Sequence, residues 1–418
     1  MVRNFYAIVC ALIVAACCPC VSLGQAHGAK SSGTTIQQSF FGADFSAGFI
    51  WPPTDGEGNT AVLGGIRLWA DGVTWANINT ASGVYDWSDM DSWIGKAQSE
   101  GVDVLYTIAD TPRWAGSIPK GTPCLASQGL YSCSAPRDVN SDGTGTDADF
   151  SNFITALVTR YKGEIAYYEL WNEPDCTCYW AGTTAQIVRM GADASSIIHS
   201  IDPDATILSP SAHGPTMRTW FDGYVAAGGA ANFQIVNFHG RGEGTTNADP
   251  EEFLTMYADV VTEVQKRDLT SMPIWDDEHG IRVGQLTDPD ELAGYVARSA
   301  ILRAGVALQR QYVFTWDGSA PYALQGSESG TAWDVVAGWL IGHTISACVA
   351  SGTVYTCALD DGQIVWDTAQ SCSNGVCTTS KYTYPAGYKW QTDLYGTKSG
   401  LSGKTVPIGY KPILLTTN

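Results

Sequence analysis

Two glutamates, Glu173 and Glu278, each stand at the end of an apolar stretch that is typical of a buried strand. The stretches read AYYELW at residues 166–171 and MPIWDDE at residues 272–278. Aromatic and branched side chains favour the pleated backbone of a strand. Two carboxyl groups in different surroundings can act as an acid and a base, and cleavage of a glycosidic bond requires such a pair. The alternative for Glu173 is structural, because Asn-Glu-Pro is also a turn sequence.

The neighbours of Glu173 favour the acid role. Trp171 precedes it and Trp180 follows it closely in the sequence. Apolar neighbours raise the pKa of a carboxyl group, because burial disfavours its charged form. Asn172 is expected to donate its amide to a sugar hydroxyl or to the nucleophile, and Trp180 is expected to contact the sugar.

Strand-like and helix-like stretches alternate over most of the chain. Strands are predicted at residues 40–45, 65–69, 102–108, 166–171, 205–210, 234–239, 272–278 and 311–316. Helices are predicted at residues 88–100, 148–162, 183–201, 215–228, 250–267, 289–308 and 331–344. Strict alternation implies a parallel sheet, and eight strands favour an α/β fold of the closed (β/α)₈ TIM barrel type over residues 39–345. An open doubly wound sheet is disfavoured, because no Gly-rich phosphate-binding turn follows the first strand.

This barrel would bring the two glutamates together. The chemistry of a TIM barrel takes place at the carboxyl ends of its strands. Glu173 follows the fourth predicted strand and Glu278 ends the seventh, and these two strands face each other across the barrel mouth. We therefore expect the two side chains to converge over one pocket.

The chain changes character after residue 345. Residues 346–418 lose the helical periodicity and alternate short strand-like stretches with Gly, Asn and Asp turns. This pattern predicts a small C-terminal β domain, β-sandwich-like, packed on the barrel.

The motif around Glu173 resembles a known family. ELWNEPD is similar to the acid/base motif of the retaining glycoside hydrolases of clan A, and WNEPDCTCYW is most similar to family 39. PIWDDEHG stands where that pattern has its nucleophile. The resemblance covers roughly residues 40–345 and implies that Glu173 is the acid/base and Glu278 the nucleophile, ~5 Å apart. It also implies a carbohydrate substrate and no cofactor. A carbohydrate-binding barrel without turnover is the alternative from another class.

The nucleophile motif departs from the family pattern. Asp277 stands directly before Glu278, where a hydroxyl residue is usual. Strand alternation predicts that Asp276 shares the face of Glu278 and that Asp277 lies on the other face. A like charge there would raise the pKa of the nucleophile. Arg67, near the end of the second strand, is expected to hold Glu278 ionised; an ordinary barrel ion pair is the alternative.

Other strand ends supply further candidates. Sugar contacts are predicted for His239 after the sixth strand, Trp316 after the eighth, His213 after the fifth and Trp114 after the third. A structural role is the alternative for each. A weaker hypothesis is a metal-dependent hydrolase; its ligands would be Asp276, Glu278, His279 and His239.

The stretch DVNSDGTGTDAD, residues 138–149, has the spacing of an EF-hand-like calcium loop. Its expected ligands are Asp138, Asn140, Asp142 and Asp149, and Gly143 stands at the invariant glycine position. The last position usually carries Glu, and no helix is predicted directly before the loop. A structural calcium ion is therefore one interpretation, and an acidic surface loop is the other.

Composition excludes some partners. The chain has 418 residues, a formal charge of −19 and 44% hydrophobic residues, which allows a large core. So many negative charges would repel a phosphate backbone, so nucleic acid is not an expected partner. No stretch outside the N-terminus is apolar enough to span a membrane, and the sequence leaves the oligomeric state open.

The N-terminus is typical of an exported protein. Arg3 precedes an apolar stretch, and small residues allow cleavage after Gly24 or Ala26, so residues 1–26 are interpreted as a signal peptide. The alternative is a lipoprotein anchored through Cys17. Eight cysteines outside this segment favour disulfides in a secreted chain. Expected pairs are Cys124–Cys133, Cys348–Cys357 and Cys372–Cys377. Cys176 and Cys178 would form a strained ring, and metal ligation is the other possibility.

Overall fold

The structure is a computed structural model that describes residues 33–45, 50–70, 72–117, 133–213, 216–241, 249–281, 286–318 and 323–418. The proposed signal peptide, Cys17 and Cys124 lie outside the described residues. Among the described residues, no helix combines the length and apolarity that crossing a bilayer requires.

A curled parallel sheet forms the centre of the molecule, as predicted. Its strands are β1 (Phe41–Asp44), β2 (Gly65–Leu68), β3 (Asp103–Thr107), β4 (Tyr167–Glu169), β5 (Thr206–Leu208), β6 (Ala212–His213), β7 (Val236–His239), β8 (Ile274–His279) and β9 (Arg310–Val313). They follow the order β5-β4-β3-β2-β1-β9-β8-β7-β6, and the neighbouring strands are parallel. The predicted strands each correspond to one of these, within a few residues.

β5 and β6 are two halves of the fifth barrel strand. Pro210 lies between them and has no N–H to donate to a ladder, which interrupts the strand. β5 pairs with β4, and β6 pairs with β7. A parallel bridge between Leu208 and Ile235 closes the ring on this side. The architecture is therefore an eight-position TIM barrel.

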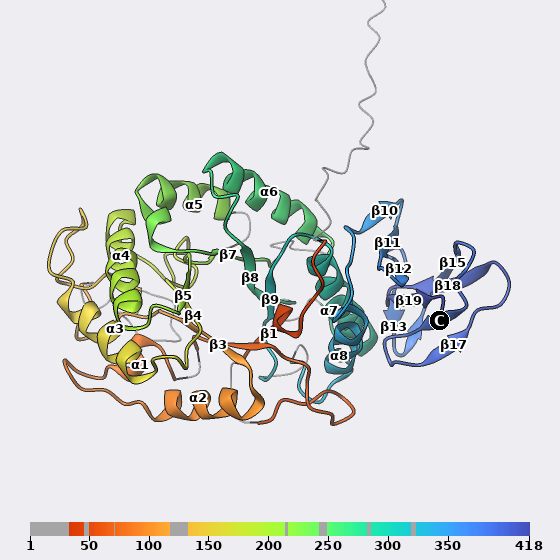
Figure 1. Ribbon diagram of the computed structural model, residues 1–418, viewed down its shortest axis with the longest axis horizontal. Helices are drawn as coiled ribbons and strands as arrows, with labels where there is room; N and C mark the ends of the chain where they lie inside the picture. The colour runs from red at the N-terminus through yellow and green to blue at the C-terminus, as the bar shows by residue number, and fades with distance from the viewer. Residues whose placement is uncertain are drawn as a thin grey trace, which may run out of the picture.

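Helices surround the strands (Figure 1). They are α1 (Trp75–Ile78), α2 (Ser88–Glu100), α3 (Ala148–Arg160), α4 (Thr184–Ile201), α5 (Met217–Ala226), α6 (Glu252–Lys266), α7 (Pro289–Ala304) and α8 (Glu328–Leu340). Capping residues determine where two of these helices begin. Thr183 and Gln186 form a capping box at the start of α4, and Asp288 caps α7, which begins with Pro289. The short α1 is the one helix in this set that the sequence did not predict.

An apolar layer fills the barrel below the strand ends. Leu105, Tyr167, Trp275 and Tyr312 belong to one cluster inside the ring. Side chains alternate along a strand, so the residue two positions on from each also faces inward. Two of those positions are Glu169 and Asp277, and both are fully buried. The strand pattern thus places a charged layer directly above the apolar one.

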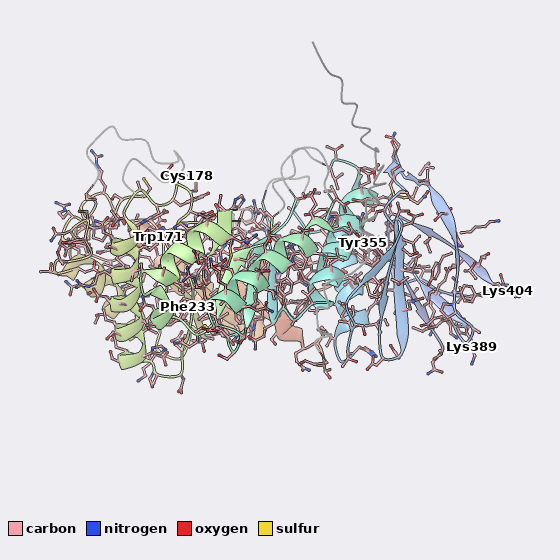
Figure 2. The ribbon with its side chains drawn as sticks, turned by 90° about the horizontal axis from the view of Figure 1, so that it is seen from above. Trp171, Cys178, Phe233, Tyr355, Lys389 and Lys404 are labelled. Carbon is pink, nitrogen blue, oxygen red and sulfur yellow. A yellow bond between two sulfur atoms is a disulfide. The ribbon has the colours of Figure 1, made fainter. Side chains whose placement is uncertain are left out.

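The C-terminal β domain lies beside α7 and α8 (Figure 1). Its strands are β10 (Val349–Ser351), β11 (Val354–Ala358), β12 (Gly362–Asp367), β13 (Cys372–Ser373), β14 (Val376–Cys377), β15 (Thr379–Thr383), β16 (Trp390–Thr392), β17 (Lys398–Gly400), β18 (Thr405–Gly409) and β19 (Ile413–Thr416). Six form one sheet in the order β10-β11-β12-β19-β16-β17, while β15 pairs with β18. Val365 and Leu415 of the sheet pack on Val406 and Ile408 of β18, so the domain has two layers as predicted. Tyr355 lies where the domain meets the barrel, and Lys389 and Lys404 lie at the distal end (Figure 2).

Disulfides occur in both the barrel and the C-terminal domain. Cys348–Cys357 and Cys372–Cys377 are bonded, as predicted. Cys133 is also disulfide-bonded, and its predicted pairing with Cys124 falls outside the described residues. Cys176 and Cys178, which the sequence left open, are bonded to each other. Tight turns bring them together: Cys176 N donates to Glu173 O, and Tyr179 N donates to Cys176 O.

Candidate active site

Arg67 organises the charged layer above the apolar core. Its side chain is fully buried. Its guanidinium contacts four carboxylates: Asp44 at 3.0 Å, Glu169 at 2.9 Å, Asp277 at 3.0 Å and Glu278 at 2.8 Å. The planar, five-donor fork of arginine suits such a shared position. The contact between Arg67 and Glu278 that the sequence predicted is therefore present.

Glu278 forms ion pairs with two arginines. Arg67 Nη1 contacts its Oε2 at 2.8 Å, and Arg241 Nη2 contacts its Oε1 at 2.7 Å. The side chain of Glu278 is 6% exposed, whereas that of Arg241 is 19% exposed. Two cations on opposite oxygens stabilise the charged carboxylate. Glu278 thus has one arginine at each carboxylate oxygen.

Glu173 lies beside Glu278. One oxygen of each carboxylate and a ring nitrogen of His239 lie within 4.8 Å of one another. This separation agrees with the ~5 Å spacing of a retaining glycosidase, which leaves no room for a water molecule between acid and nucleophile. Glu173 has a left-handed backbone (φ 40°) and lies four residues after the buried end of β4 at Glu169. This turn directs its side chain to the carboxyl end of the barrel.

His239 binds Glu173 directly. Its Nδ1 lies 2.7 Å from Glu173 Oε1. Burial favours the neutral carboxyl, but the hydrogen bond and charge of His239 lower the pKa of Glu173 to about 2. Burial lowers the pKa of His239, but Glu278, Asp277 and Glu173 together raise it well above its ordinary value. The expectation that apolar neighbours raise the pKa of Glu173 is therefore wrong in the free protein, because a buried imidazole outweighs them.

Asn172 connects Arg67 with the fifth barrel strand. Its Oδ1 accepts from Arg67 Nη2 at 2.8 Å, and its backbone bridges to Ser211. Its buried Nδ2 has no hydrogen-bond partner among the described residues. A buried amide donor without a partner is costly, and a ligand hydroxyl would satisfy it.

Asp276 and Asp277 lie on the opposite sides of strand β8 (Ile274–His279) from those predicted. Asp277 points into the barrel, with its Oδ2 3.0 Å from Arg67 Nε. Asp276 points outward, where it accepts from Arg303 Nε at 2.7 Å and from Gly240 N at 2.8 Å. The register shifts between Asp276 and His279 along β8. This irregularity places consecutive residues, Asp277 and Glu278, on the same side, which strict alternation cannot do.

Glu169 completes the layer below the nucleophile. It accepts from Thr107 Oγ1 at 2.5 Å and from the hydroxyl of Ser211. Burial raises the pKa of Glu169 to about 8. Burial raises the pKa of Asp277, but the effect of Arg67 and His239 is larger, so the pKa of Asp277 stays below its ordinary value. One neutral and one charged carboxyl thus lie side by side, which limits the repulsion toward Glu278.

The structure does not assemble the metal-dependent alternative. Asp276 is bonded to Arg303, and His279 Nδ1 lies 3.3 Å from Ser299 Oγ on α7. Burial lowers the pKa of His279 well below its ordinary value. Two of the four expected ligands thus face the outer helices, while Glu278 and His239 face the barrel mouth.

Two of the tryptophans predicted to contact the sugar are buried in the structure. Trp316 is fully buried, packs against Trp333 and donates to Gln325 Oε1 at 2.9 Å. Trp180 is 4% exposed and packs edge-on against Trp171. Both rings are thus packed against other tryptophans with almost no exposed surface. Figure 2 shows Cys178 at the periphery, further out than Trp171.

The remaining predicted contacts lie at different distances from the glutamates. His213 is half-buried, its N donates to both oxygens of Asp175 at 3.1 Å, and its charge contributes to the low pKa of Glu173. Trp114 instead lines a separate pocket of about 650 Å³, together with Tyr85 and Trp87. Its Nε1 donates to Asn79 O at 2.7 Å.

Three residues at the site were missed. Arg241 follows the predicted strand end at His239 and is the second partner of Glu278. Tyr179 follows the disulfide-bonded turn; burial raises its pKa, and Glu173 and Glu278 add to this shift. Trp69 packs edge-on against Tyr179 at 5.7 Å. Trp69 ends a predicted strand, so the strand-end rule could have found it.

The loop at residues 138–149 does not form the predicted EF-hand-like ligand set. Asn140 Nδ2 donates to Thr144 Oγ1, and Asp142 Oδ1 accepts from Thr144 N and Oγ1. Asp138 Oδ2 accepts from Ala148 N at 2.6 Å, close to Asp149 at the start of α3. Val139 and Gly145 form an antiparallel bridge. Local turn hydrogen bonds therefore engage the amide of Asn140, Oδ1 of Asp142 and Oδ2 of Asp138.

Comparisons with known proteins agree with this arrangement. The sequence matches the family model described as Cellulase (glycosyl hydrolase family 5) over residues 66–264, which include Arg67, Glu173 and His239. No curated protein matches the chain. Among solved structures it is similar to a family 39 glycoside hydrolase from the gut symbiont Bacteroides cellulosilyticus WH2, with a TM-score of 0.67 and 16% identity over 92% of this chain and 82% of that one.

Two further structures share the fold. A monomeric beta-xylosidase from Caulobacter crescentus CB15 has a TM-score of 0.60 and 14% identity over 93% of this chain and 97% of that one. A GH30 endoxylanase from Clostridium papyrosolvens C71 has a TM-score of 0.56 and 12% identity over 93% and 98%. The family model and the fold together confirm the resemblance to clan A: the chain is a glycosidase with the barrel fold of the clan A glycoside hydrolases.

Proposed function

We propose that this glycosidase cleaves the O-glycosidic bonds of poly- or oligosaccharides by double displacement, with Glu278 as nucleophile and Glu173 as acid/base. The carrying observation is the pair of carboxylates within 4.8 Å of each other. In the first step Glu278 attacks the anomeric carbon, and the leaving oxygen takes a proton from Glu173. In the second step Glu173 takes a proton from water, whose oxygen displaces Glu278 from the sugar.

The surrounding residues support these two roles. Arg67 and Arg241 bind the two oxygens of Glu278 and hold the carboxylate in place for the attack. The unpaired Nδ2 of Asn172 supports a hydrogen bond to a sugar hydroxyl. The proton for the leaving group comes from the pair of Glu173 and His239, which shares one proton across a 2.7 Å contact.

The substrate we propose is a neutral β-linked plant polysaccharide of the hemicellulose or cellulose class. The similar structures are described as a beta-xylosidase and an endoxylanase, and the family model as a cellulase. The formal charge of −19 disfavours strongly acidic polymers. Trp114, Tyr85 and Trp87 would bind an outer part of such a chain, because flat apolar rings suit sugar faces.

We also propose that the protein is exported. Six of the described cysteines form three disulfides and Cys133 is disulfide-bonded as well. Such bonds are common outside the cell and rare in the cytosol. N-terminal sequencing of protein from the culture medium tests this; an intact Met1 or a lipid on Cys17 would contradict cleavage near residue 26.

The test of the reaction is a trapping experiment. Incubation with a 2-deoxy-2-fluoro glycoside and peptide mass analysis should find the sugar on Glu278. Time-resolved NMR of the products should show the anomer of the substrate configuration first. A label on another carboxylate would contradict the nucleophile assignment, and the inverted anomer would contradict double displacement. A panel of xylan, xyloglucan and cellulose derivatives then identifies the polymer.

A further inference from the structure

The pocket of about 650 Å³ that Trp114 lines lies on the outside of the barrel wall. One face of α3 forms a long side of this pocket, through Asp149, Asn152, Thr155, Ala156, Thr159 and Arg160. The other face of α3 is buried in the core, through Phe150, Phe153, Ile154, Leu157 and Val158. Helix α3 therefore separates the pocket from the interior of the barrel.

The pocket follows α3 along the wall. A helix that connects two parallel strands runs back against them, so Asp149 lies toward the carboxyl ends of the strands and Arg160 toward the opposite end of the barrel. A rise of about 1.5 Å per residue makes this face of α3 about 16 Å long. We call the pocket the α3 groove. It leads away from the end of the barrel at which Glu173 and Glu278 lie.

Aromatic rings with fixed orientations line the groove. Tyr85 and Trp87 stack with their centroids 5.3 Å apart and their planes at 22°. Tyr161 packs edge-on against Trp87 at 5.7 Å, so Trp87 supports the ring of Tyr85 from behind. Trp114 is held by the bond from its Nε1 to Asn79 O at 2.7 Å. The three rings of the lining are half-buried, and flat apolar rings suit the faces of sugars.

A rigid turn forms another part of the lining. Asn79 Nδ2 donates to Ala81 O at 2.7 Å and to Val84 O at 3.0 Å, and Ala81 and Val84 form an antiparallel bridge. Ser82 and Gly83 at the tip of this turn line the groove. The backbone of Gly83 is left-handed (φ 71°), which favours glycine. A lining that is already ordered loses little conformational freedom when it binds a ligand.

The polar groups of the groove suit a neutral ligand. Arg160 donates to Asp91 through Nε at 2.9 Å and through Nη2 at 2.7 Å, so its charge is paired. Asp149 carries the other charge in the described lining, and it would repel an anion. Amide and hydroxyl side chains such as Asn152 and Thr155 make up most of the remaining polar lining. These groups form hydrogen bonds with hydroxyls.

We propose that the α3 groove is a second carbohydrate-binding site, separate from the catalytic site, which holds a segment of a neutral β-linked oligosaccharide along the outer wall of the barrel. The inference rests on the proposed function, which supplies the class of sugar. Tyr85 and Trp114 contact sugar faces, and the side chains of α3 bind hydroxyls. A site in this place keeps the enzyme on its polymer between turnovers and takes no part in bond cleavage.

Counting the bound ligands tests the proposal. Full-length protein carrying Glu278→Gln, which leaves the sugar uncut, is examined by equilibrium dialysis with radiolabelled cellotriose and xylotriose, since trisaccharides are too short to fill both sites. We expect two bound molecules per chain at saturation. Thr155 is exposed on α3, so adding Thr155→Arg should fill the groove and leave one. Tyr85→Ala should instead raise the Kd of one of the two sites by ~5-fold or more.

Ser196→Arg in the same Glu278→Gln protein is the matched control. Ser196 is exposed on α4 outside the groove, so this variant adds the same charge and should still bind two molecules. Equal numbers and equal Kd values for Thr155→Arg and Ser196→Arg would overturn the second site, as would the absence of binding of both trisaccharides. One bound molecule that Thr155→Arg abolishes would support the groove, and it would show that the catalytic site does not bind these sugars, which contradicts the proposed substrate alone.

Discussion

Arg67 Nη1 lies 2.8 Å from Glu278 Oε2, and the same guanidinium also contacts Asp277 and Glu169 below the nucleophile. The position of Glu278 and of the carboxyl groups below it therefore depends largely on one buried side chain. Lysine carries the same charge but lacks the planar fork. Arg67→Lys should lower kcat on an aryl glycoside by ~10²-fold or more and destabilise the protein by about 3 kcal/mol, because buried carboxylates lose their partners.

Arg241→Lys is the control for that variant. Arg241 also binds Glu278, but it is partly exposed. It should reduce kcat while changing the free energy of unfolding by less than about 1 kcal/mol. Kinetics and urea unfolding measure both quantities, and an Arg67→Lys enzyme as active and as stable as the parent would contradict the central role of Arg67.

Glu278→Gln and Glu173→Gln should fail in different ways. Glu278→Gln removes the nucleophile, so the rate should fall by at least ~10³-fold on every substrate. Glu173→Gln removes acid assistance, which a polysaccharide needs and a dinitrophenyl leaving group does not. A burst of dinitrophenol followed by slow turnover should therefore appear with Glu173→Gln alone. Equal losses of both variants on the activated substrate would reverse or remove the assigned roles.

The pH profile should report the Glu173–His239 pair rather than one residue. The pKa of Glu173 is lowered to about 2 and that of His239 is raised, so between these values the pair holds one proton. Activity requires that proton on the leaving oxygen, so it should fall as pH rises through the pKa of His239, above the ordinary histidine value of about 6.5.

Removal of the imidazole should move this alkaline limb to lower pH. In His239→Asn burial still raises the pKa of Glu173, while the largest of the causes that lower it is gone and only the weaker charges of His213 and Arg241 remain, so the carboxyl group alone holds the proton. The pH at which activity falls is then the pKa of the Glu173 carboxyl group and no longer the raised pKa of His239. The measurement is kcat/KM against pH for the parent, His239→Asn and His199→Asn on α4; an unchanged limb in His239→Asn would rule out the shared proton.

Much of the barrel could be predicted from the sequence, because alternation of short apolar strands with amphipathic helices has few other solutions. The two glutamates and Arg67 followed from strand ends. Asp277 was placed on the wrong face because alternation was counted back from Glu278. Counting forward from Trp275, which packs inside the barrel, gives the inward face for Asp277.

Contacts between distant segments could not be predicted in the same way. Burial of Trp316 depends on Trp333 of α8, and that of Trp180 on its packing against Trp171. The low pKa of Glu173 depends on His239, 66 residues away. Local sequence shows that these residues are aromatic or titratable, but tertiary packing decides whether they face a ligand or a neighbour.

Trp114 should affect long substrates and spare short ones. It lines the 650 Å³ pocket with Tyr85 and Trp87, apart from the two glutamates. Trp114→Ala should raise KM for the polysaccharide several-fold, because the packing of a sugar face on the flat indole ring is lost. It should leave kcat/KM for an aryl glycoside unchanged. A loss on the aryl glycoside as large as on the polymer would mean that Trp114 acts through the fold and not through sugar binding.

Trp366 should contribute to the attachment of the C-terminal β domain to the barrel. It is fully buried in β12 and donates through Nε1 to Glu251 Oε1 at 2.7 Å. Glu251, at the start of α6, also accepts from Arg298 Nε of α7 at 2.8 Å. Trp366→Phe keeps an aromatic ring but removes the donor. The remaining bond from Arg298 keeps the acceptor satisfied, so the expected loss is about 1 to 2 kcal/mol in the free energy of unfolding.

Trp390→Phe is the matched control, because Trp390 lies in the same domain and is 38% exposed. Its effect should stay within about 0.5 kcal/mol. Urea unfolding followed by fluorescence and by circular dichroism measures both variants. If the hydrogen bond joins the two parts into one cooperative unit, the two probes coincide for the parent and separate for Trp366→Phe. Coincident transitions with no loss of stability would show that the apolar contacts between β12 and the helices suffice for the attachment.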